Sequence, residues 1–189
     1  MKKVDIIRIR YLIYCAIHRN GYDHAAFLKK HNVFHSMGDD CFFQPWNVCA
    51  DSQYVRFGNN VVVASNVDFV CHDVTDIMLN KSDISGFEYK RYWGSIDIGD
   101  NVFIGSGVQI LPDVKVGNNV IIAAGAVVNS DIPDNVIVGG VPAKIIGNVD
   151  NFRKKRQEYS QTELADLKRP ERIKYLWKLR DKEGKDDNV

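Results

Sequence analysis

A run of six-residue units constrains the fold of this chain more than any other feature. Residues 98–133 read IGDNVF, IGSGVQ, ILPDVK, VGNNVI, IAAGAV and VNSDIP. Each unit begins with a branched aliphatic residue, has Val, Ala or Ile at its fifth position, and places small or turn-forming residues at its third and fourth. Neither a helix nor a simple strand has a strict period of six. A short strand followed by a tight turn does, because Asn, Asp and Gly tolerate the left-handed backbone of a turn.

The same register extends toward the N-terminus. The units FGNNVV, VASNVD and FVCHDV cover residues 57–74, and an imperfect unit begins at Met37. The pattern fails over residues 75–95 and resumes at Ile96. Three units per coil would stack into a triangular prism, a parallel β-helix with the first-position side chains inside. We therefore predict an all-β domain, a parallel β-helix of hexapeptide repeats over residues 37–149, with an insertion loop at 75–95.

Helical patterns flank the repeats on both sides. Residues 4–19 place apolar side chains at helical spacing, and residues 23–30 fit a second short helix. We predict an N-terminal helical segment over residues 1–36 and a charged C-terminal helical extension over residues 150–189. The apolar face of that extension includes Ile173, Leu176, Trp177 and Leu179.

The composition is that of one globular domain. The chain has 189 residues, of which 45% are hydrophobic, and a formal net charge of +1. This charge balance gives no reason to invoke nucleic acid or a membrane surface as the main partner. No apolar run suits a signal peptide or a membrane span. The four cysteines follow no metal or disulfide spacing, so we expect reduced thiols, no bound metal and a cytoplasmic protein.

One unit breaks the column of turn formers at the fourth position. Asn, Gly or Asp occupies this corner position in the other regular units, whereas FVCHDV has His72 there, directly before the break. A neutral imidazole can accept a proton from a hydroxyl group near neutral pH. We therefore interpret His72 as a general base, rather than as a histidine that only tolerates a turn.

The two neighbours of His72 have different expected roles. Asp73 either belongs to the substrate site, where it would orient His72 or the insertion, or caps the loop that follows. Cys71 should point to the opposite face from His72, because successive residues of a strand do so, and it is a poor candidate for a nucleophile.

The insertion combines aromatic and basic residues. Aromatic faces suit sugar rings, so these residues either contact a saccharide acceptor or anchor the loop to the prism wall. Trp93 is the preferred single contact, and Asn47, in the irregular stretch before the repeats, is a weaker candidate. The aromatic and basic residues of the insertion are Phe87, Tyr89, Lys90, Arg91, Tyr92 and Trp93.

Three features together resemble a known family. They are the array of units, the stretch FVCHD at 69–73 before the insertion, and DIPDN at 131–135 leading to VGGVPAK at 138–144. With these features the chain resembles the hexapeptide-repeat acyltransferases, most closely the sugar, maltose and galactoside O-acetyltransferases that include capsule- and lipopolysaccharide-modifying enzymes. The resemblance implies a left-handed coil, a homotrimer with active sites between subunits, and acetyl-coenzyme A as acyl donor.

The resemblance also implies a cofactor groove parallel to the prism axis. The expected cofactor contacts are Phe103, Ser106, Ala124, Asn129, Ser130 and Lys144. Relatives often have Trp in place of Phe103, Thr-Lys in place of Asn129-Ser130, and a basic residue in place of Gly147. These departures leave fewer expected contacts for the phosphates of the cofactor.

We therefore predict an acetyl-coenzyme A-dependent O-acetyltransferase that acts on a hydroxyl group of a sugar or polysaccharide precursor, with His72 as base and no covalent enzyme intermediate. Two alternatives remain: an N-acetyltransferase that acts on an amino sugar or a nucleotide-linked amino sugar, and a non-catalytic β-helix scaffold. A zinc lyase like the γ-class carbonic anhydrases would need three histidine ligands on facing coils, and His72 is the single histidine of the repeats.

Overall fold

The computed structural model describes the backbone of residues 3–186 and the side chains of residues 6–181. The chain divides into two compact units, Met1–Val149 and Asp150–Val189. The first unit contains all the strands together with the N-terminal helices, and the second contains the C-terminal helices. No helix in the described part of the chain is long and apolar enough to cross a membrane.

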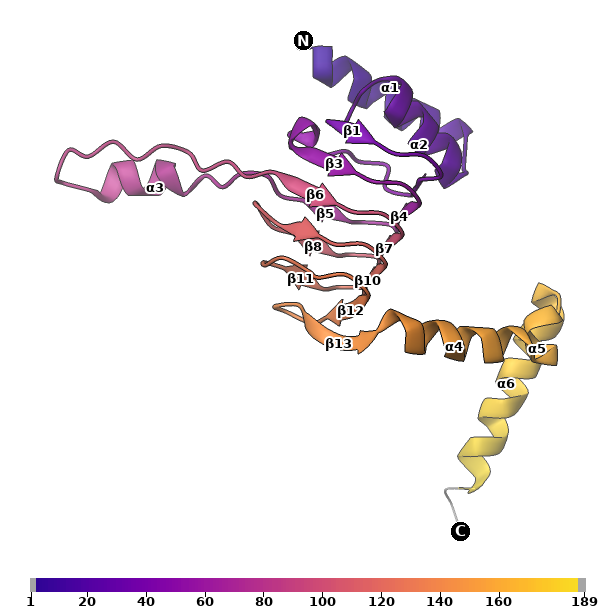
Figure 1. Cartoon of the computed structure of the whole chain (residues 1–189). Coiled ribbons are helices and arrows are strands. Elements are labelled where there is room, and N and C mark those ends of the chain that lie inside the picture. Colours follow the sequence, from indigo (N-terminus) through magenta and orange to yellow (C-terminus); the bar gives the residue numbers. More distant parts are fainter. Residues whose placement is uncertain (1–2, 187–189) are drawn as a thin grey trace. The chain divides into compact units, whose positions relative to one another are not determined.

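Short strands stack into three sheets, which form the faces of a prism (Figure 1). Face A contains β1 (Ser36–Met37), β3 (Val55–Phe57), β6 (Ile96–Ile98) and β9 (Lys115–Val116). Face B contains β2 (Phe42–Phe43), β4 (Val61–Val63), β7 (Val102–Ile104), β10 (Val120–Ile122), β12 (Val136–Gly139) and β13 (Lys144–Asn148). Face C contains β5 (Asp68–Phe69), β8 (Gln109–Ile110) and β11 (Val127–Val128). The pairing is parallel throughout except between β12 and β13, so the array is a parallel β-helix closed by one antiparallel strand.

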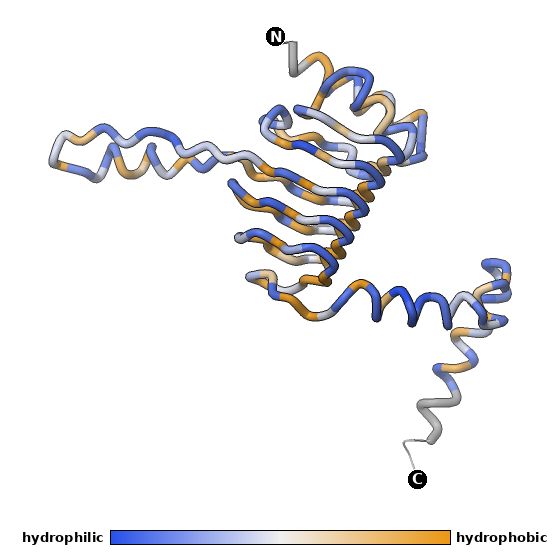
Figure 2. Tube along the Cα trace, viewed as in Figure 1, coloured by the Kyte–Doolittle hydropathy of each residue, from blue (hydrophilic) through white to orange (hydrophobic). Residues whose placement is uncertain are grey.

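The interior of the prism follows the six-residue register. First-position residues pair with each other in successive coils, as Phe57 does with Ile98 and Ile98 with Val116. Apolar residues therefore recur along every coil in Figure 2, and this part of the prediction is confirmed. The buried first- and fifth-position residues are Phe57, Val61, Val63, Val67, Phe69, Ile98, Val102, Ile104, Val108, Ile110, Val114, Val116, Val120, Ile122, Ala126, Val128 and Ile132.

The edges of the prism are the turns between faces, and we name them AB, BC and CA by the faces that they join. Most fourth-position residues have positive φ, as a tight turn requires. At edge AB the side chains also stack, since Asn60 Nδ2 donates to Asn101 Oδ1 at 2.9 Å and Asn101 Nδ2 donates to Asn119 Oδ1 at 3.2 Å. The fourth-position residues with positive φ are Asn60, Asn66, Asn101, Gly107, Asp113, Asn119 and Gly125.

Two helices, α1 (Lys3–Ile17) and α2 (Gly21–Lys30), cover one end of the prism (Figure 1). Tyr11 Oη donates to the main-chain oxygen of Pro45 at 2.8 Å, and the ring of His24 lies 3.1 Å from the oxygen of Phe43. Gly21 begins α2 because its missing Cβ lets the backbone approach the ring of Phe42, and Asn20 caps the helix by accepting from the Tyr22 amide.

The predicted insertion is not a simple loop, because it begins with helix α3 (Thr75–Ser82) and projects away from the prism (Figure 1). A 3₁₀ turn, η1 (Ser52–Tyr54), precedes β3. The second unit contains α4 (Val149–Ser160), α5 (Glu163–Asp166) and α6 (Arg169–Asp186), as the charged C-terminal pattern indicated. Within α4, the guanidinium of Arg156 lies 4.9 Å from the ring centroid of Phe152.

Candidate functional site

At His72 the chain leaves the prism. Instead of turning with positive φ, His72 forms an antiparallel bridge with Trp93. The Gly94 amide donates to the oxygen of Cys71 at 2.8 Å, and the Asp73 amide donates to the oxygen of Tyr92 at 3.3 Å. The outgoing and returning segments therefore form a narrow neck at edge CA. A left-handed turn is not required there, so the fourth position is free for a histidine.

His72 is held by a carboxylate from a different coil. Its Nδ1 lies 2.5 Å from Asp51 Oδ2, and the two side chains are 28% and 20% exposed. Asp51 directly precedes η1, which aims it toward edge CA. A carboxylate that accepts from Nδ1–H fixes the tautomer in which Nε2 carries the free lone pair. No hydrogen bond of Nε2 occurs among the described residues, so this nitrogen is available to a substrate.

Aromatic rings line one side of His72. The ring centroid of Trp93 lies 4.6 Å from that of His72, and Tyr54 stacks on Trp93 at 5.3 Å with an interplanar angle of 25°. Both aromatic side chains are about half exposed. Together they form a continuous aromatic wall from edge CA onto the outside of face A.

A pocket of about 310 Å³ lies at the Tyr54 end of this wall. Arg56 Nε donates to Asp97 Oδ1 at 2.8 Å, and this ion pair forms part of the lining. An aromatic platform beside charged and amide side chains is suited to a ligand with both ring faces and hydroxyl groups. The lining residues are His35, Gln53, Tyr54, Arg56, Ser95, Ile96 and Asp97.

The cysteines near His72 are unsuited to nucleophilic chemistry. Burial, together with the charge of Asp51, raises the pKa of Cys71 to about 11. Burial, with smaller contributions from Cys71 and Asp51, raises the pKa of Cys49 to about 12. Because the thiolate is the reactive form, both thiols are poor nucleophiles at neutral pH. This agrees with the expectation for Cys71.

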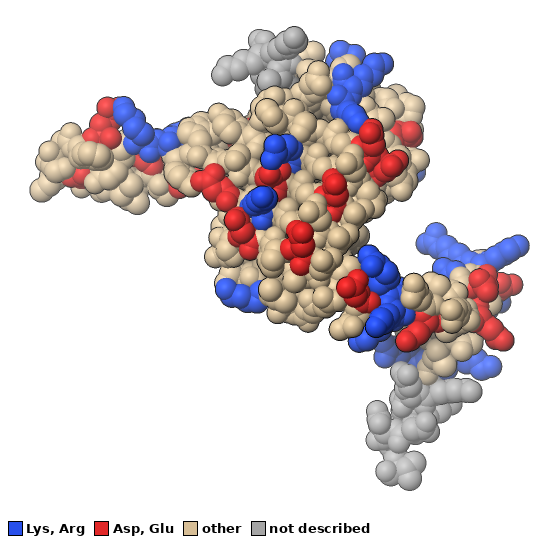
Figure 3. All heavy atoms as spheres, in the orientation of Figure 1, with Lys and Arg blue, Asp and Glu red and all other residues tan. Residues whose placement is uncertain are grey.

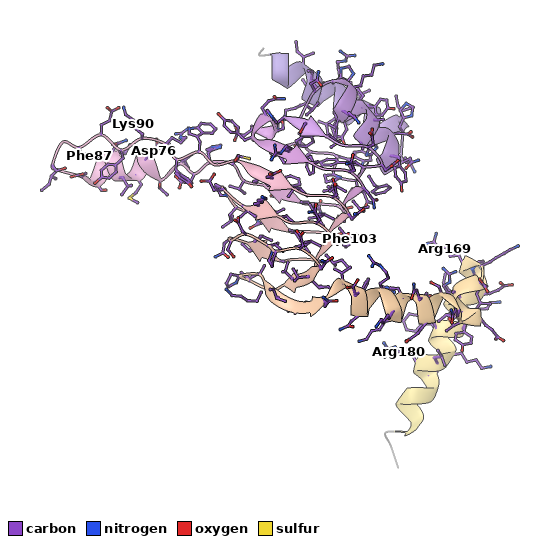
Figure 4. All side chains as sticks on the ribbon, viewed as in Figure 1. Asp76, Phe87, Lys90, Phe103, Arg169 and Arg180 are labelled. Atoms are coloured by element: carbon purple, nitrogen blue, oxygen red, sulfur yellow. The ribbon has the colours of Figure 1, made fainter. Side chains whose placement is uncertain are left out.

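Asp73 lies just before Val74, the N-cap residue of α3, and binds the first residue of the helix. Its Oδ1 accepts hydrogen bonds from the Thr75 amide at 3.1 Å and from the Thr75 hydroxyl at 2.8 Å. Of the two expected roles, this geometry favours the loop cap over a place in the substrate site. Further along the insertion, Arg91 pairs with Asp76 at 3.2 Å, and Figure 4 shows Asp76 and Phe87 on the projecting segment, away from the prism.

Asn47 faces the N-terminal helix. Its Oδ1 accepts from Arg8 Nη2 at 3.4 Å, and it lines a hollow beside α1 together with Trp46. No described contact joins Asn47 to His72. Its expected place in the acceptor site is therefore not supported by a contact within one chain.

The expected cofactor residues lie on different parts of the prism. Ser106 and Ala124 lie at edge BC, whereas Asn129 and Ser130 lie at edge CA, two coils along from His72. Face C lies between edges BC and CA, and the five residues from Ala124 to Asn129 span at most roughly 16 Å at 3.3 Å per residue. One chain therefore does not bring all these residues together. All four are exposed.

The other two expected residues lie apart from these edges. Phe103 is exposed on the outside of face B, in β7, and points away from the prism in Figure 4. Lys144 is the first residue of β13, beyond the last complete coil, and is also exposed.

Sequence reasoning missed Asp51 and Tyr54. Both come from the irregular stretch between β2 and β3, where no repeat register applies. Their proximity to edge CA depends on how η1 folds across the coil, and no spacing in the sequence indicates it.

Comparison with known proteins identifies the repeat. A family model described as bacterial transferase hexapeptide (six repeats) matches residues 95–130. Protein CapG of Staphylococcus aureus is 39% identical over 122 residues, which cover 63% of this chain and 69% of CapG. Galactoside O-acetyltransferase of Escherichia coli K12 is 35% identical over 113 residues, which cover 58% of this chain and 52% of that enzyme. The chain spans about half the length of the first curated relatives that it matches, between 51% and 55%.

A solved structure supports the same fold. A galactoside acetyltransferase crystallised in complex with coenzyme A superposes with a TM-score of 0.51 at 23% identity, covering 82% of this chain and 86% of that one. The stacked coils, the matched repeat and the extent of the match to CapG together show that the chain belongs to the hexapeptide-repeat transferase family.

Proposed function

We propose that this protein is an acetyl-coenzyme A-dependent O-acetyltransferase that acts on a hydroxyl group of a sugar or a polysaccharide precursor. The observation that carries the proposal is the pair of His72 and Asp51, which leaves Nε2 of the imidazole without a described partner beside Trp93. This arrangement supplies a base at an aromatic surface, and the transfer of an acyl group to a hydroxyl needs both. The names of relatives such as galactoside O-acetyltransferase support the same reaction class.

The residues present can perform the transfer without a covalent intermediate. Nε2 of His72 takes the proton of the acceptor hydroxyl while the hydroxyl oxygen attacks the thioester carbonyl carbon. Asp51 stabilises the imidazolium that forms. A backbone amide or a hydroxyl group stabilises the tetrahedral oxyanion. When the intermediate collapses, the carbon–sulfur bond breaks, and the leaving thiolate takes the proton back from His72.

The split of the expected cofactor residues supports an active site between subunits. Edge CA of one chain carries His72, Asn129 and Ser130, and edge BC of a neighbouring chain would carry Ser106 and Ala124. Three copies around a threefold axis create three equivalent grooves of this kind. Phe103 and Lys144 then serve the thiol end and the phosphates of acetyl-coenzyme A respectively. We propose this homotrimer, with the coil left-handed as the family resemblance implies.

We propose that the aromatic wall of Trp93 and Tyr54, together with the pocket at its end, determines which saccharide binds. Ring faces of sugars stack on aromatic side chains, and Gln53, His35 and the ion pair of Arg56 with Asp97 offer partners for hydroxyl groups.

A coenzyme A release assay tests the proposal. Purified protein is incubated with acetyl-coenzyme A and a panel of sugars, nucleotide-sugars and their amino-sugar counterparts. We expect acceptor-dependent release with a hydroxyl acceptor, and its loss in His72→Ala but not in the matched control Asn60→Ala, which changes a regular fourth position at edge AB. Equal turnover by wild type and His72→Ala would show that His72 is not the base. Turnover with amino sugars alone would favour the N-acetyltransferase.

A further inference from the structure

Helix α1 has two apolar faces, and the prism covers one of them. Tyr11 and Cys15 are buried against the rest of the first unit. On the opposite side five large aliphatic side chains are between 44% and 71% exposed. At 100° per residue, these side chains and Ala16 occupy a single arc of roughly 140°. We call this the outer face of α1, and it consists of Ile6, Ile9, Leu12, Ile13, Ala16 and Ile17.

Basic residues border the outer face. Arg8 lies at one margin of the arc and Arg10 at the other, and Arg19 follows the end of the helix. Among the described residues, neither Arg10 nor Arg19 forms a salt bridge. The side-chain hydrogen bond that the structure shows for Arg8 goes to Asn47, which is neutral. Figure 3 shows basic side chains at this end of the prism. No acidic side chain of residues 6–17 interrupts the stripe.

A half-exposed tryptophan lies next to this face. Trp46 lines a hollow of about 250 Å³ together with Arg8, Ile9 and Leu12. Tryptophan suits a boundary between water and hydrocarbon, because its ring is apolar and its indole N–H is polar. The hollow therefore extends the outer face with a residue of the type found at membrane interfaces.

We propose that the outer face of α1 binds the surface of a membrane that contains anionic phospholipids. The aliphatic side chains would insert at the boundary between headgroups and acyl chains, with Arg8 and Arg10 at the level of the phosphates. A helix of 15 residues is about 22 Å long, shorter than the hydrocarbon core, and only part of its circumference is available, so it lies on the membrane rather than across it. This role is independent of acyl transfer.

The charges favour an anionic lipid surface over a second copy of this chain. A twofold contact between two outer faces would bring the arginines of both copies together. The first twenty residues contain five basic residues and one acidic residue, an excess of positive charge that the net charge of +1 for the whole chain conceals. The composition therefore gave no reason to expect a membrane surface as partner.

Vesicle flotation of the full chain tests the proposal. The probes are vesicles of phosphatidylcholine alone and vesicles of phosphatidylcholine mixed equally with phosphatidylglycerol. We expect wild type to float with the mixed vesicles and to bind them less at high salt, since salt screens the arginines but not the apolar contacts. The double variant Ile9→Glu with Ile13→Glu should lose about tenfold or more of its binding, because two exposed aliphatic side chains that would insert into the membrane become charged.

Matched variants separate this face from other surfaces. Ile77→Glu with Ile84→Glu makes the same change at exposed positions of the insertion and should float like wild type. Arg10→Glu should weaken binding more than Arg169→Glu, which alters the net charge equally in the second unit. Circular dichroism melts show whether each variant is folded.

Three outcomes would overturn the proposal. Folded wild type could fail to float with anionic vesicles at low salt. The two double variants of isoleucine could reduce vesicle binding equally, which would show that the membrane binds to a surface other than the outer face of α1. Light scattering could show that Ile9→Glu with Ile13→Glu changes only the number of subunits, in which case the face joins copies of the chain.

Discussion

The regular coils and the coil that contains His72 share one interior but differ at one edge. Phe69, in the coil of His72, stacks on Ile110 in face C, and both are buried. At the fourth position the regular coils turn with positive φ, as at Gly107 and Asn119, whereas His72 bridges to Trp93 and the chain leaves the prism. The inward positions thus maintain the fold, while the corner position can be changed without disturbing the core.

We therefore expect the interior of the coils to determine stability and the corner at His72 to determine catalysis. Substitutions inside a regular coil should change the free energy of unfolding and affect catalysis only through it. Substitutions around the neck at His72 should change turnover with little effect on unfolding.

The largest effect is expected inside the regular coil next to His72. Ile110→Ala removes a fully buried side chain and leaves a cavity, so the protein should lose about 2–5 kcal/mol of unfolding free energy. Urea denaturation measures this loss. His72→Ala is the comparison and should unfold near the wild-type midpoint, because the imidazole is partly exposed. If His72→Ala also lost several kcal/mol of unfolding free energy, the two regions would not differ in their contribution to stability.

Asp51→Asn should have the next largest effect, and the effect should be on turnover. The hydrogen bond to a charged partner contributes about 1.5–3 kcal/mol, which corresponds to roughly a 10- to 150-fold loss of kcat. Asp68→Asn, on the exposed side of β5, is the matched control and should keep wild-type kcat. An unchanged kcat in Asp51→Asn would contradict the positioning role.

Gly107→Ala tests the regular turn. No atom lies within 4 Å of the Cβ that it would add, so only the positive φ of 71° opposes the substitution. The expected loss is about 1–2 kcal/mol. Gly105→Ala, where the added Cβ would lie 2.5 Å from the main-chain nitrogen of Ala124, should be distinctly worse. If thermal melts showed equal losses of stability for the two variants, the backbone at Gly105 would have to shift to accommodate the added Cβ.

Asp73→Ala should loosen the insertion at the neck. Loss of the cap on Thr75 is expected to cost about 1 kcal/mol, and it should appear as faster amide exchange in α3. Exchange in β8 and β10 should stay as in wild type. Unchanged exchange in α3 would show that the cap does not hold the insertion helix.

The smallest effect is expected for the ion pair on the outside of face A. The hydrogen bond and charge of Arg56 lower the pKa of Asp97, so this pair stabilises the fold above the ordinary carboxyl pKa of about 3.9. The stabilisation is lost as the pH falls through the lowered value. Wild type should therefore be slightly more stable than Asp97→Asn at pH 6, and the difference should vanish in strong acid. A difference that persists there would have another cause.

The register of the repeat could be predicted from the sequence, because each position of a six-residue unit has a single structural requirement. Ile98 and Val102 must fill the interior of the prism, and Asn101 must adopt a left-handed turn. The residue type therefore indicates where each residue lies in the coil. His72 stood out for the same reason, as the exception in a uniform column. Asp51 and Tyr54 could not be found this way, because their positions depend on an irregular segment that packs against the neighbouring coil.

The division of the expected cofactor residues between two edges was equally hidden. Spacing along the chain shows that Ala124 and Asn129 are five residues apart, but only the three faces show that a whole side of the prism separates their edges. From this division we infer that the site is completed by a second chain.

Mixing two inactive variants tests whether two chains complete one active site. His72→Ala removes the base from edge CA, and Ala124→Arg blocks edge BC, so each variant alone should be inactive. In trimers that combine both chains at random in equal amounts, about one site in four joins an intact edge CA to an intact edge BC of the next subunit. We predict that coenzyme A release recovers to about a quarter of the wild-type rate. If mixed trimers isolated by two different tags show no recovery, each active site lies within one chain and no second chain completes it.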